Sequence, residues 1–470
     1  TGGSISVNGQ NITLVVTDAG SSLATTNPFT ISATPGSTYV FGNMIGGDYY
    51  NSTSAALGSN GSLVNGLNSI VLFGTGSNVT SAGNNVSGMV LSGQYASKPF
   101  YFSGEGYTAA EDGTNLGIIS LADSSAGMYL TGGASGRNEG TVSVGKQSVG
   151  IYAAGAGAYV VNNNGIINVG EESTGIFLSD GIRAENLGTA EINGTGNKAV
   201  GIYSENTAAG AVQITNDNKI DLAGEQSIGI YASGNHNISN TGNILIGNSS
   251  DPDQPGVGIY QDGIAGSISN TGNINAGDNS IGIYNINGTV TNSGSVTAGN
   301  GGTGIYTNGG TLNLNSGSSI AVGGNNAIGV YALNQTGTLT NNSAVTIGDS
   351  SYGFVFSGST APVFINSQAA VTGNDSIFTF ADSILDVTNN AAVTMTGSNN
   401  IGYYLKNGGS VVNNANITGN TGTSNIGIYA KNSTITNNSD IILGDSVLTE
   451  YTAPNGIKYK TGYSVGIYGE

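Results

Sequence analysis

The chain has 470 residues, 79 of them glycine, and its 28 acidic and 10 basic residues give a formal net charge of −18. So few cations cannot neutralise a run of phosphates, which excludes nucleic-acid binding and disfavours anionic membrane surfaces. With no Cys and one His, disulfides, thiol chemistry and multi-histidine metal sites are excluded, so we expect no metal and no cofactor. Hydrophobic residues still make up 37% of the chain, enough for an ordered core.

Residues 1–126 alternate in the manner of β-strands without a regular repeat, as in Ser4–Val7 and Asn11–Val16. An open end of a stacked β-structure exposes a sheet edge that needs cover. We therefore expect looser coils or a capping region in 1–126, followed by regular repeats in 127–470.

From Gly127 onward a tripeptide of Gly, an aliphatic residue and an aromatic residue recurs, mostly every 22 to 29 residues. A second segment of the form aliphatic-x-Asn follows at a steady offset within each unit. We assign its asparagine to Asn138, Asn163, Asn216, Asn240, Asn270, Asn292, Asn341, Asn389, Asn413 and Asn437. An asparagine column at a bend is expected to be structural, because stacked amides hydrogen-bond to one another.

Each unit contains three short alternating stretches separated by Gly, Asn, Asp or Ser, and no stretch has the 3.6-residue period of a helix. Propeller blades would need about 40 residues per unit. The sequence therefore predicts an all-β fold, a right-handed parallel β-helix with about three short strands in each coil of 22–29 residues.

In Val149-Gly150-Ile151-Tyr152 strict alternation places Val149 and Ile151 inward and Gly150 and Tyr152 outward. The equivalent aromatic residues would then form a ladder along the coils. Such a ladder is either an aromatic stripe that stacks on sugars or on a partner protein, or a structural stack that shields the sheet. A reversed sheet orientation would instead place the ladder in the core.

Because β-helices host polysaccharide lyases and hydrolases, an enzyme is a possible function, and glycoside hydrolysis would require carboxylates that converge on one surface. The adjacent acidic pairs are Glu111-Asp112 and Glu171-Glu172, and the latter is expected at a solvated bend. His236 has no catalytic motif beside it and is expected at a surface bend. We therefore expect no catalytic residues and a protein that is not an enzyme.

Three insertions depart from the repeat, and insertions in solenoids often carry binding loops. They are Lys98–Asn115, Ser250–Pro255 and Leu448–Tyr463, and they combine aromatic with charged residues, a composition that interfaces favour. The candidate partner-binding residues are Phe100, Tyr101, Phe102, Tyr107, Asp251, Asp253, Gln254, Glu450, Tyr451, Lys458, Tyr459, Lys460 and Tyr463. Ordinary loops that cover the coils are the alternative interpretation.

Units such as Asn240–Gly247, and the Ser-x-Gly-Ile-Tyr segment at Ser280–Tyr284, resemble the passenger repeats of the large fusobacterial type V autotransporter adhesins. The resemblance covers about 127–470. It implies a rod at the bacterial cell surface that is secreted through an outer-membrane barrel, and we expect that barrel to lie outside this sequence. Members of that family include an arginine-inhibitable coaggregation adhesin and a galactose-binding adhesin that also engages immune receptors. The matching motif is scaffold, so no binding residues carry over.

The expected function is thus that of an extracellular adhesin fragment, a monomeric, non-enzymatic rod whose loops or side faces bind a host receptor, a glycan or another bacterium. A β-helical polysaccharide-degrading enzyme is the first alternative. A pure spacer stalk that holds a distal tip away from the cell is the second.

Overall fold

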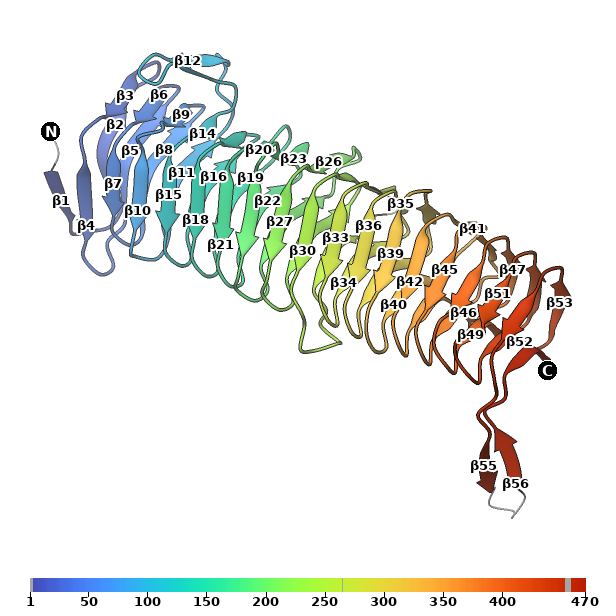
Figure 1. Ribbon diagram of the computed structural model, residues 1–470. Coiled ribbons are helices and arrows are strands. Elements are labelled where there is room, and N and C mark those ends of the chain that lie inside the picture. Colours follow the sequence, from blue (N-terminus) through green and yellow to red (C-terminus); the bar gives the residue numbers. More distant parts are fainter. Residues whose placement is uncertain (1–2, 264, 453–457) are drawn as a thin grey trace. The chain divides into compact units, whose positions relative to one another are not determined.

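The computed structural model describes residues 3–263, 265–452 and 458–470 (Figure 1). None of these residues lies in a helix, so this part of the chain contains no helix able to cross a membrane. Its strands form a right-handed parallel β-solenoid with three strands in each of about 18 coils, which confirms the predicted fold class. The chain divides into two compact units, residues 1–246 and 247–470.

Three parallel sheets, called A, B and C below, run through each unit, and each coil adds one strand to each sheet. In the first unit, sheet A consists of β1 (Gly3–Val7), β4 (Phe29–Ala33), β7 (Ser54–Leu57), β10 (Asn78–Ser81), β15 (Ile118–Leu121), β18 (Thr141–Val144), β21 (Ile166–Val169), β24 (Glu191–Gly194), β27 (Lys219–Leu222) and β30 (Asn243–Ile246). Its sheet B consists of β2 (Ile12–Thr17), β5 (Tyr39–Ile45), β8 (Gly61–Leu67), β11 (Val86–Ser92), β16 (Ala126–Thr131), β19 (Val149–Ala154), β22 (Thr174–Ser179), β25 (Val200–Asn206) and β28 (Ile228–Gly234). Its sheet C consists of β3 (Ser22–Thr25), β6 (Asp48–Asn51), β9 (Ile70–Phe73), β14 (Gly113–Asn115), β17 (Gly136–Asn138), β20 (Tyr159–Asn163), β23 (Arg183–Leu187), β26 (Val212–Asn216) and β29 (His236–Asn240).

The second unit repeats this arrangement. Its sheet A consists of β33 (Asn273–Ala276), β36 (Ser295–Ala298), β39 (Ser319–Val322), β42 (Ala344–Ile347), β45 (Ala370–Thr372), β48 (Val393–Met395), β51 (Ile417–Gly419) and β54 (Ile441–Leu443). Its sheet B consists of β31 (Val257–Gln261), β34 (Ile281–Ile286), β37 (Thr303–Asn308), β40 (Ile328–Leu333), β43 (Tyr352–Ser357), β46 (Ile377–Ala381), β49 (Ile401–Leu405), β52 (Ile426–Ala430) and β57 (Val465–Gly469). Its sheet C consists of β32 (Ser267–Asn270), β35 (Thr289–Asn292), β38 (Thr311–Leu314), β41 (Thr338–Asn341), β44 (Val363–Asn366), β47 (Leu385–Asn389), β50 (Gly409–Asn413) and β53 (Ser433–Asn437).

Two antiparallel hairpins interrupt these sheets. The first pairs β12 (Phe100–Phe102) with β13 (Tyr107–Ala109), in the first unit. The second pairs β55 (Thr449–Thr452) with β56 (Lys458–Thr461), in the second unit. Both fall within insertions that depart from the sequence repeat.

The core is a set of aliphatic columns inside the coils. In sheet A of the first unit, Ile119, Val142, Ile167, Ile192 and Ile220 pair in register, and each is fully buried. Full burial of such a side chain stabilises a fold by about 1.5–3 kcal/mol. Stacked columns of this kind offset the entropy lost on ordering so glycine-rich a chain.

The repeat tripeptide does not alternate strictly between the two faces of sheet B. In β19, Ile151 is buried and Tyr152 is partly exposed, which confirms the inward position of the first and the outward position of the second. The other two positions were predicted wrongly. Gly150 is buried and Val149 is partly exposed, so the glycine points inward and the valine outward.

At the glycine the regular alternation of the strand is interrupted, and the pairing register of sheet B skips this residue on both paired strands. A Cβ atom on Gly150 would stand 2.6 Å from the carbonyl oxygen of Gly175 and 2.8 Å from Cγ2 of Ile167. Glycine is therefore required because the next coil and a core side chain come too close for any other residue.

A column of buried asparagines runs through sheet C, and its members are joined amide to amide. In the first unit each Nδ2 donates to the Oδ1 of the next coil at 2.7–2.8 Å, through Asn115, Asn138, Asn162, Asn186, Asn216 and Asn240. In the second unit the column contains Asn270, Asn292, Asn341, Asn366, Asn389, Asn413 and, exposed at its end, Asn437, with Leu314 between the second and third members. These bonds satisfy polar groups that would be costly to bury alone, which confirms the predicted structural role.

One assignment in this column was wrong. Asn162, not Asn163, is the buried member, because adjacent residues of a strand point to opposite faces. Asn163 lies outside the column and donates to the carboxylate of Glu139 at 3.2 Å. Asn115, Asn186 and Asn366 also belong to the column and were not assigned to it from the sequence.

His236 does not lie at a surface bend as predicted. It is the first residue of β29, where it pairs in register with Val212 and takes an inward position. The side chain is fully buried, and its Nε2 lies 2.9 Å from the Oγ of Ser204. The histidine is therefore part of the core of the first unit.

Candidate functional site

The hairpin of β12 and β13 covers the outer face of sheet C in the first unit (Figure 1). After β11 the chain leaves the solenoid and returns at β14. The hairpin therefore lies within the insertion that the sequence marks as Lys98–Asn115.

A small hydrophobic cluster attaches the hairpin to the solenoid. Phe102 and Ala109 of the hairpin pack with Ile70 and Leu72 of β9, and all four side chains are buried. All four residues of β9 are buried, because one face of the strand meets the solenoid interior and the other meets the hairpin. The unbroken apolar run of β9 is the signal in the sequence that this strand is covered on both sides.

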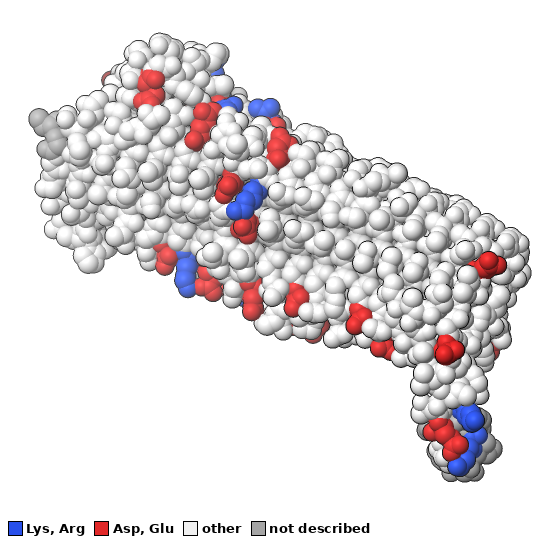
Figure 2. Space-filling view, viewed as in Figure 1, with Lys and Arg blue, Asp and Glu red and all other residues white. Residues whose placement is uncertain are grey.

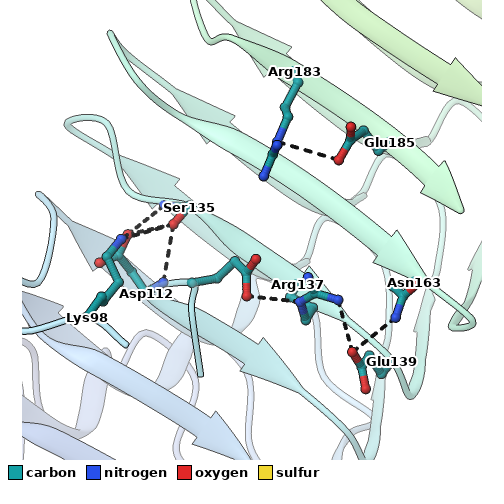
Figure 3. Close-up of polar contacts among 9 residues, drawn as sticks. Lys98, Asp112, Ser135, Arg137, Glu139, Asn163, Arg183 and Glu185 are labelled. Carbon is teal, nitrogen blue, oxygen red and sulfur yellow. Dashed lines mark hydrogen bonds and ion pairs between the residues drawn. The ribbon is translucent and has the colours of Figure 1, made fainter. Parts of the chain in front are cut away.

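A buried ion pair closes the stem of the insertion (Figure 3). Lys98 Nζ lies 2.8 Å from Oδ2 of Asp112, which is fully buried. The same carboxylate accepts hydrogen bonds from the backbone and hydroxyl of Ser135, each at 2.8 Å, and from the backbone of Tyr95 at 2.7 Å. Because each oxygen of this carboxylate is hydrogen-bonded, the buried charge is well compensated.

A second ionic group lies beside the first. Arg137 contacts Glu111 at 2.9 Å and Glu139 at 3.0 Å, and only 2% of the Glu111 side chain is exposed. Although burial opposes the guanidinium charge, the two carboxylates, chiefly Glu111, raise the pKa of Arg137. Burial, together with the nearby charge of Glu139, raises the pKa of Tyr107 on β13 to about 12.

The turn of the hairpin is also tied to the solenoid. Glu105 accepts hydrogen bonds from the hydroxyl of Tyr50 at 2.8 Å and from the backbone of Thr75 at 2.8 Å. Burial alone would raise the pKa of Glu105, but the bonds from Thr75 and Tyr50 lower it overall. The hairpin is thus held at its stem, its centre and its turn.

Between the hairpin and sheet C lies a groove of about 400 Å³. Ser22, Asp48 and Tyr50 come from β3 and β6, and Phe100 and Tyr101 come from β12. Tyr101 is 60% exposed, and the hydroxyl of Ser22 donates to Asp48 Oδ1 at 2.6 Å. Aromatic rings beside a carboxylate and hydroxyl groups can make apolar, cation–π and hydrogen-bonded contacts with a ligand.

Of the candidate residues, the structure brings together Phe100, Tyr101, Phe102 and Tyr107. Phe102 is 4% exposed and serves as an anchor, whereas Tyr101 remains open to a partner. Sequence reasoning missed Asp48, which lies on an ordinary strand of sheet C and carries no motif.

The insertion Ser250–Pro255 forms a compact turn of the second unit. Asp251 accepts hydrogen bonds from the backbone of Asp253 at 2.9 Å and from the side chain of Gln254 at 3.2 Å. Asp253 and Gln254 are exposed, and Asp251 is partly buried. The acidic residue therefore shapes the turn that presents its neighbours.

The hairpin of β55 and β56 projects from the second unit. Lys458 contacts Glu450 at 2.6 Å, and both side chains are more than half exposed. The Lys and Arg side chains of the second unit that are visible in Figure 2 gather on this hairpin, where Lys460 is also exposed. Tyr463 is 48% exposed. The side chains of Tyr451 and Tyr459 lie outside the described residues.

The predicted aromatic ladder forms on the outer face of sheet B. In the first unit it joins Tyr129, Tyr152, Phe177, Tyr203 and Tyr231, with ring centroids 4.6–5.1 Å apart and planes within 22° of parallel. A ring inside such a stack has both faces against neighbouring rings. It therefore presents its edge to solvent, which disfavours face-on stacking of sugars along the ladder.

The two acidic pairs differ in their surroundings. Both carboxylates of Glu111-Asp112 are buried and bound by cations. In the other pair, Lys146 binds Glu171 and Lys198 lies 3.9 Å from Glu172, at an exposed bend as predicted. Among the described residues there is no group of three or more His, Cys, Asp or Glu placed to hold a metal ion.

The geometry thus defines one candidate interaction site, the hairpin of β12 and β13 with the groove beneath it. Comparisons of the chain with protein-family models, with curated proteins and with solved structures found no match.

Proposed function

We propose that this chain is an adhesive β-solenoid, a non-enzymatic scaffold that binds a partner through the hairpin of β12 and β13. One observation carries the proposal: buried ion pairs and an outer hydrophobic cluster hold in place a hairpin that leaves Tyr101 60% exposed beside a groove. Ordering a loop in advance lowers the entropy cost of binding, so a fixed exposed aromatic is suited to recognition.

The setting of this function is the surface of a bacterium, and the partner is a host protein, a glycan or another bacterium. The resemblance of the repeats to fusobacterial autotransporter passengers supports this setting. Most cations are paired with neighbouring carboxylates, so few remain to attract an acidic partner. The partner is therefore expected to be neutral or basic at its contact surface.

The test measures binding of the purified chain to a glycan array, to epithelial and lymphocyte membranes and to other bacteria. Tyr101→Ser is expected to weaken the binding about 30-fold, the effect of losing an aromatic hot spot. Tyr463→Ser, at the second hairpin, is the matched control and is expected to bind like the parent chain. Equal binding by both variants and the parent would refute the assignment of the site.

The same preparations distinguish the alternative functions. Release of reducing sugar ends from a bound polysaccharide, abolished by neutralising one acidic cluster, would identify an enzyme. Failure of the folded chain to bind any of these targets would favour a spacer.

A further inference from the structure

The second unit contains an unbroken run of four stacked tyrosines. Tyr260, Tyr284, Tyr306 and Tyr331 lie on β31, β34, β37 and β40, where they pair in register. Their ring centroids are 5.1, 4.5 and 5.5 Å apart, and the ring planes are tilted by 10°, 11° and 21°. Val355 occupies the next position and ends the run.

The backbone fixes this geometry. In-register parallel strands repeat every 4.7–4.9 Å, about the separation of the rings, so each ring stacks on the ring of the next coil. The rings are partly exposed, and water and small oxidants can therefore reach their edges. Burial and the neighbouring phenols Tyr284 and Tyr331 raise the pKa of Tyr306.

We propose that this run of tyrosines is a site of oxidative cross-linking, in which Cε–Cε bonds between neighbouring rings join adjacent coils as dityrosine. The oxidant is a peroxide acting with a one-electron-oxidising haem peroxidase. The proposal concerns covalent modification of the scaffold and does not depend on the proposed binding function.

The cross-linking reaction removes two electrons and two protons from each pair of tyrosines. Each of two neighbouring phenols loses one electron and its hydroxyl proton, and the two phenoxyl radicals combine through one Cε carbon of each ring. The hydrogen displaced from each of these carbons moves to the phenol oxygen and restores the aromatic ring. The two hydrogen atoms lost in total reduce one hydrogen peroxide to two waters.

The first unit provides an internal comparison. Phe177 lies between Tyr152 and Tyr203, with centroids 5.1 and 4.6 Å from theirs. Phenylalanine stacks equally well but has no hydroxyl from which a hydrogen can be abstracted. Bonds are therefore expected between Tyr129 and Tyr152, which are 4.6 Å apart, and not at Phe177.

The experiment treats the full purified chain with horseradish peroxidase and hydrogen peroxide. The folded monomer is expected to gain dityrosine fluorescence and to lose the mass of two hydrogen atoms per bond. Peptide mass spectrometry should find Tyr284 bonded to Tyr306. The cross-linked peptide should be at least about tenfold more abundant from the folded chain than from chain oxidised in urea, because the stack holds the two rings next to each other.

Tyr306→Phe keeps the ring stack and is expected to abolish the bonds of residue 306, while the bond between Tyr260 and Tyr284 remains. A Tyr101→Ser/Tyr463→Ser variant removes two exposed, unstacked tyrosines and should leave the bonds within the monomer unchanged. Three results would each overturn the proposal. The first is dityrosine only between chains, and the second is an equal yield of the bond between Tyr284 and Tyr306 in folded and urea-treated chain. The third is an undiminished yield of dityrosine in Tyr306→Phe.

Discussion

The two hairpins are alike in the kinds of residues that they contain and differ in how they are held. Each is an antiparallel insertion that combines aromatic and charged residues. The first packs Phe102 on β9 and pairs the fully buried Asp112 with Lys98. The second has its ion pair, between Lys458 and Glu450, on its own exposed strands. The comparison teaches that composition can mark an insertion as a candidate site, whereas the residues beneath it determine whether it is rigid.

The difference between the two hairpins in the free energy of unfolding should be largest when their ion pairs are removed. Asp112→Ala leaves Lys98 without its carboxylate and is expected to lower the free energy of unfolding by about 3–5 kcal/mol. Glu450→Ala, the matched change in the second hairpin, should cost less than about 1 kcal/mol because its pair is exposed. Urea denaturation measures both values, and limited proteolysis should show the first hairpin opened only in Asp112→Ala. Equal losses would contradict the difference in anchoring.

The hydrophobic contact beneath the first hairpin should have the next largest effect. Leu72→Ala removes a fully buried side chain between β9 and the hairpin and is expected to lower the free energy of unfolding by about 2–4 kcal/mol. Leu448→Ala precedes the second hairpin at a position that is 45% exposed, and it should change stability by less than about 0.5 kcal/mol. Hydrogen exchange of the hairpin strands provides a second readout, and slow exchange of β12 in Leu72→Ala would argue against the contact.

The attachment of the first hairpin should also depend on alkaline pH. The pKa of Tyr107 is about 12 in the folded chain and 10.0 for the ordinary side chain, so folding favours the protonated phenol. Its contribution is present below pH 10 and is lost as the pH rises towards 12. Proteolysis within β12 and β13 should accelerate over this range, and Tyr107→Phe should shift the acceleration to higher pH. The same pH profile in Tyr107→Phe and the parent chain would show that another group controls the opening.

The smallest effect on stability is expected for Tyr101→Ser. Because this side chain is 60% exposed, the free energy of unfolding should change by less than about 0.5 kcal/mol. Thermal denaturation checks this, and it also shows whether a loss of binding reflects recognition and not unfolding. A larger loss would mean that Tyr101 helps to hold the hairpin.

The fold could be predicted from the sequence because each coil repeats the same physical pattern. Alternating aliphatic residues indicated strands, and the regular spacing indicated parallel stacking. The prediction of which side chains point inward failed at positions where the strand departs from regular alternation. Gly150 and Ile151 are both buried although they are adjacent in the strand. Of the adjacent residues Asn162 and Asn163, only Asn162 points inward.

The candidate site could be predicted only in part. The insertion and its aromatic residues were visible, but Arg137 and Ser135, which bind Glu111 and Asp112, come from the next coil. Arg137 and Ser135 lie on and beside β17, after the insertion, and nothing in the sequence pairs them with it. The placement of His236 failed for a related reason, because its hydrogen-bond partner Ser204 lies one coil earlier.

The interruption of the asparagine column at Leu314 has a mechanical consequence. At this level of the second unit, sheet C has one bridged pair, Leu314 with Asn341, whereas the pairing of β35 with β38 joins four residues. No hydrogen bond between side-chain amides supplements this contact, because the side chain of leucine has no amide group. Tension along the solenoid axis loads the hydrogen bonds between coils. Among the described strand pairings of sheet C in the second unit, β38 and β41 share the fewest paired residues. When force is applied to the second unit, its coils should therefore begin to separate between β38 and β41.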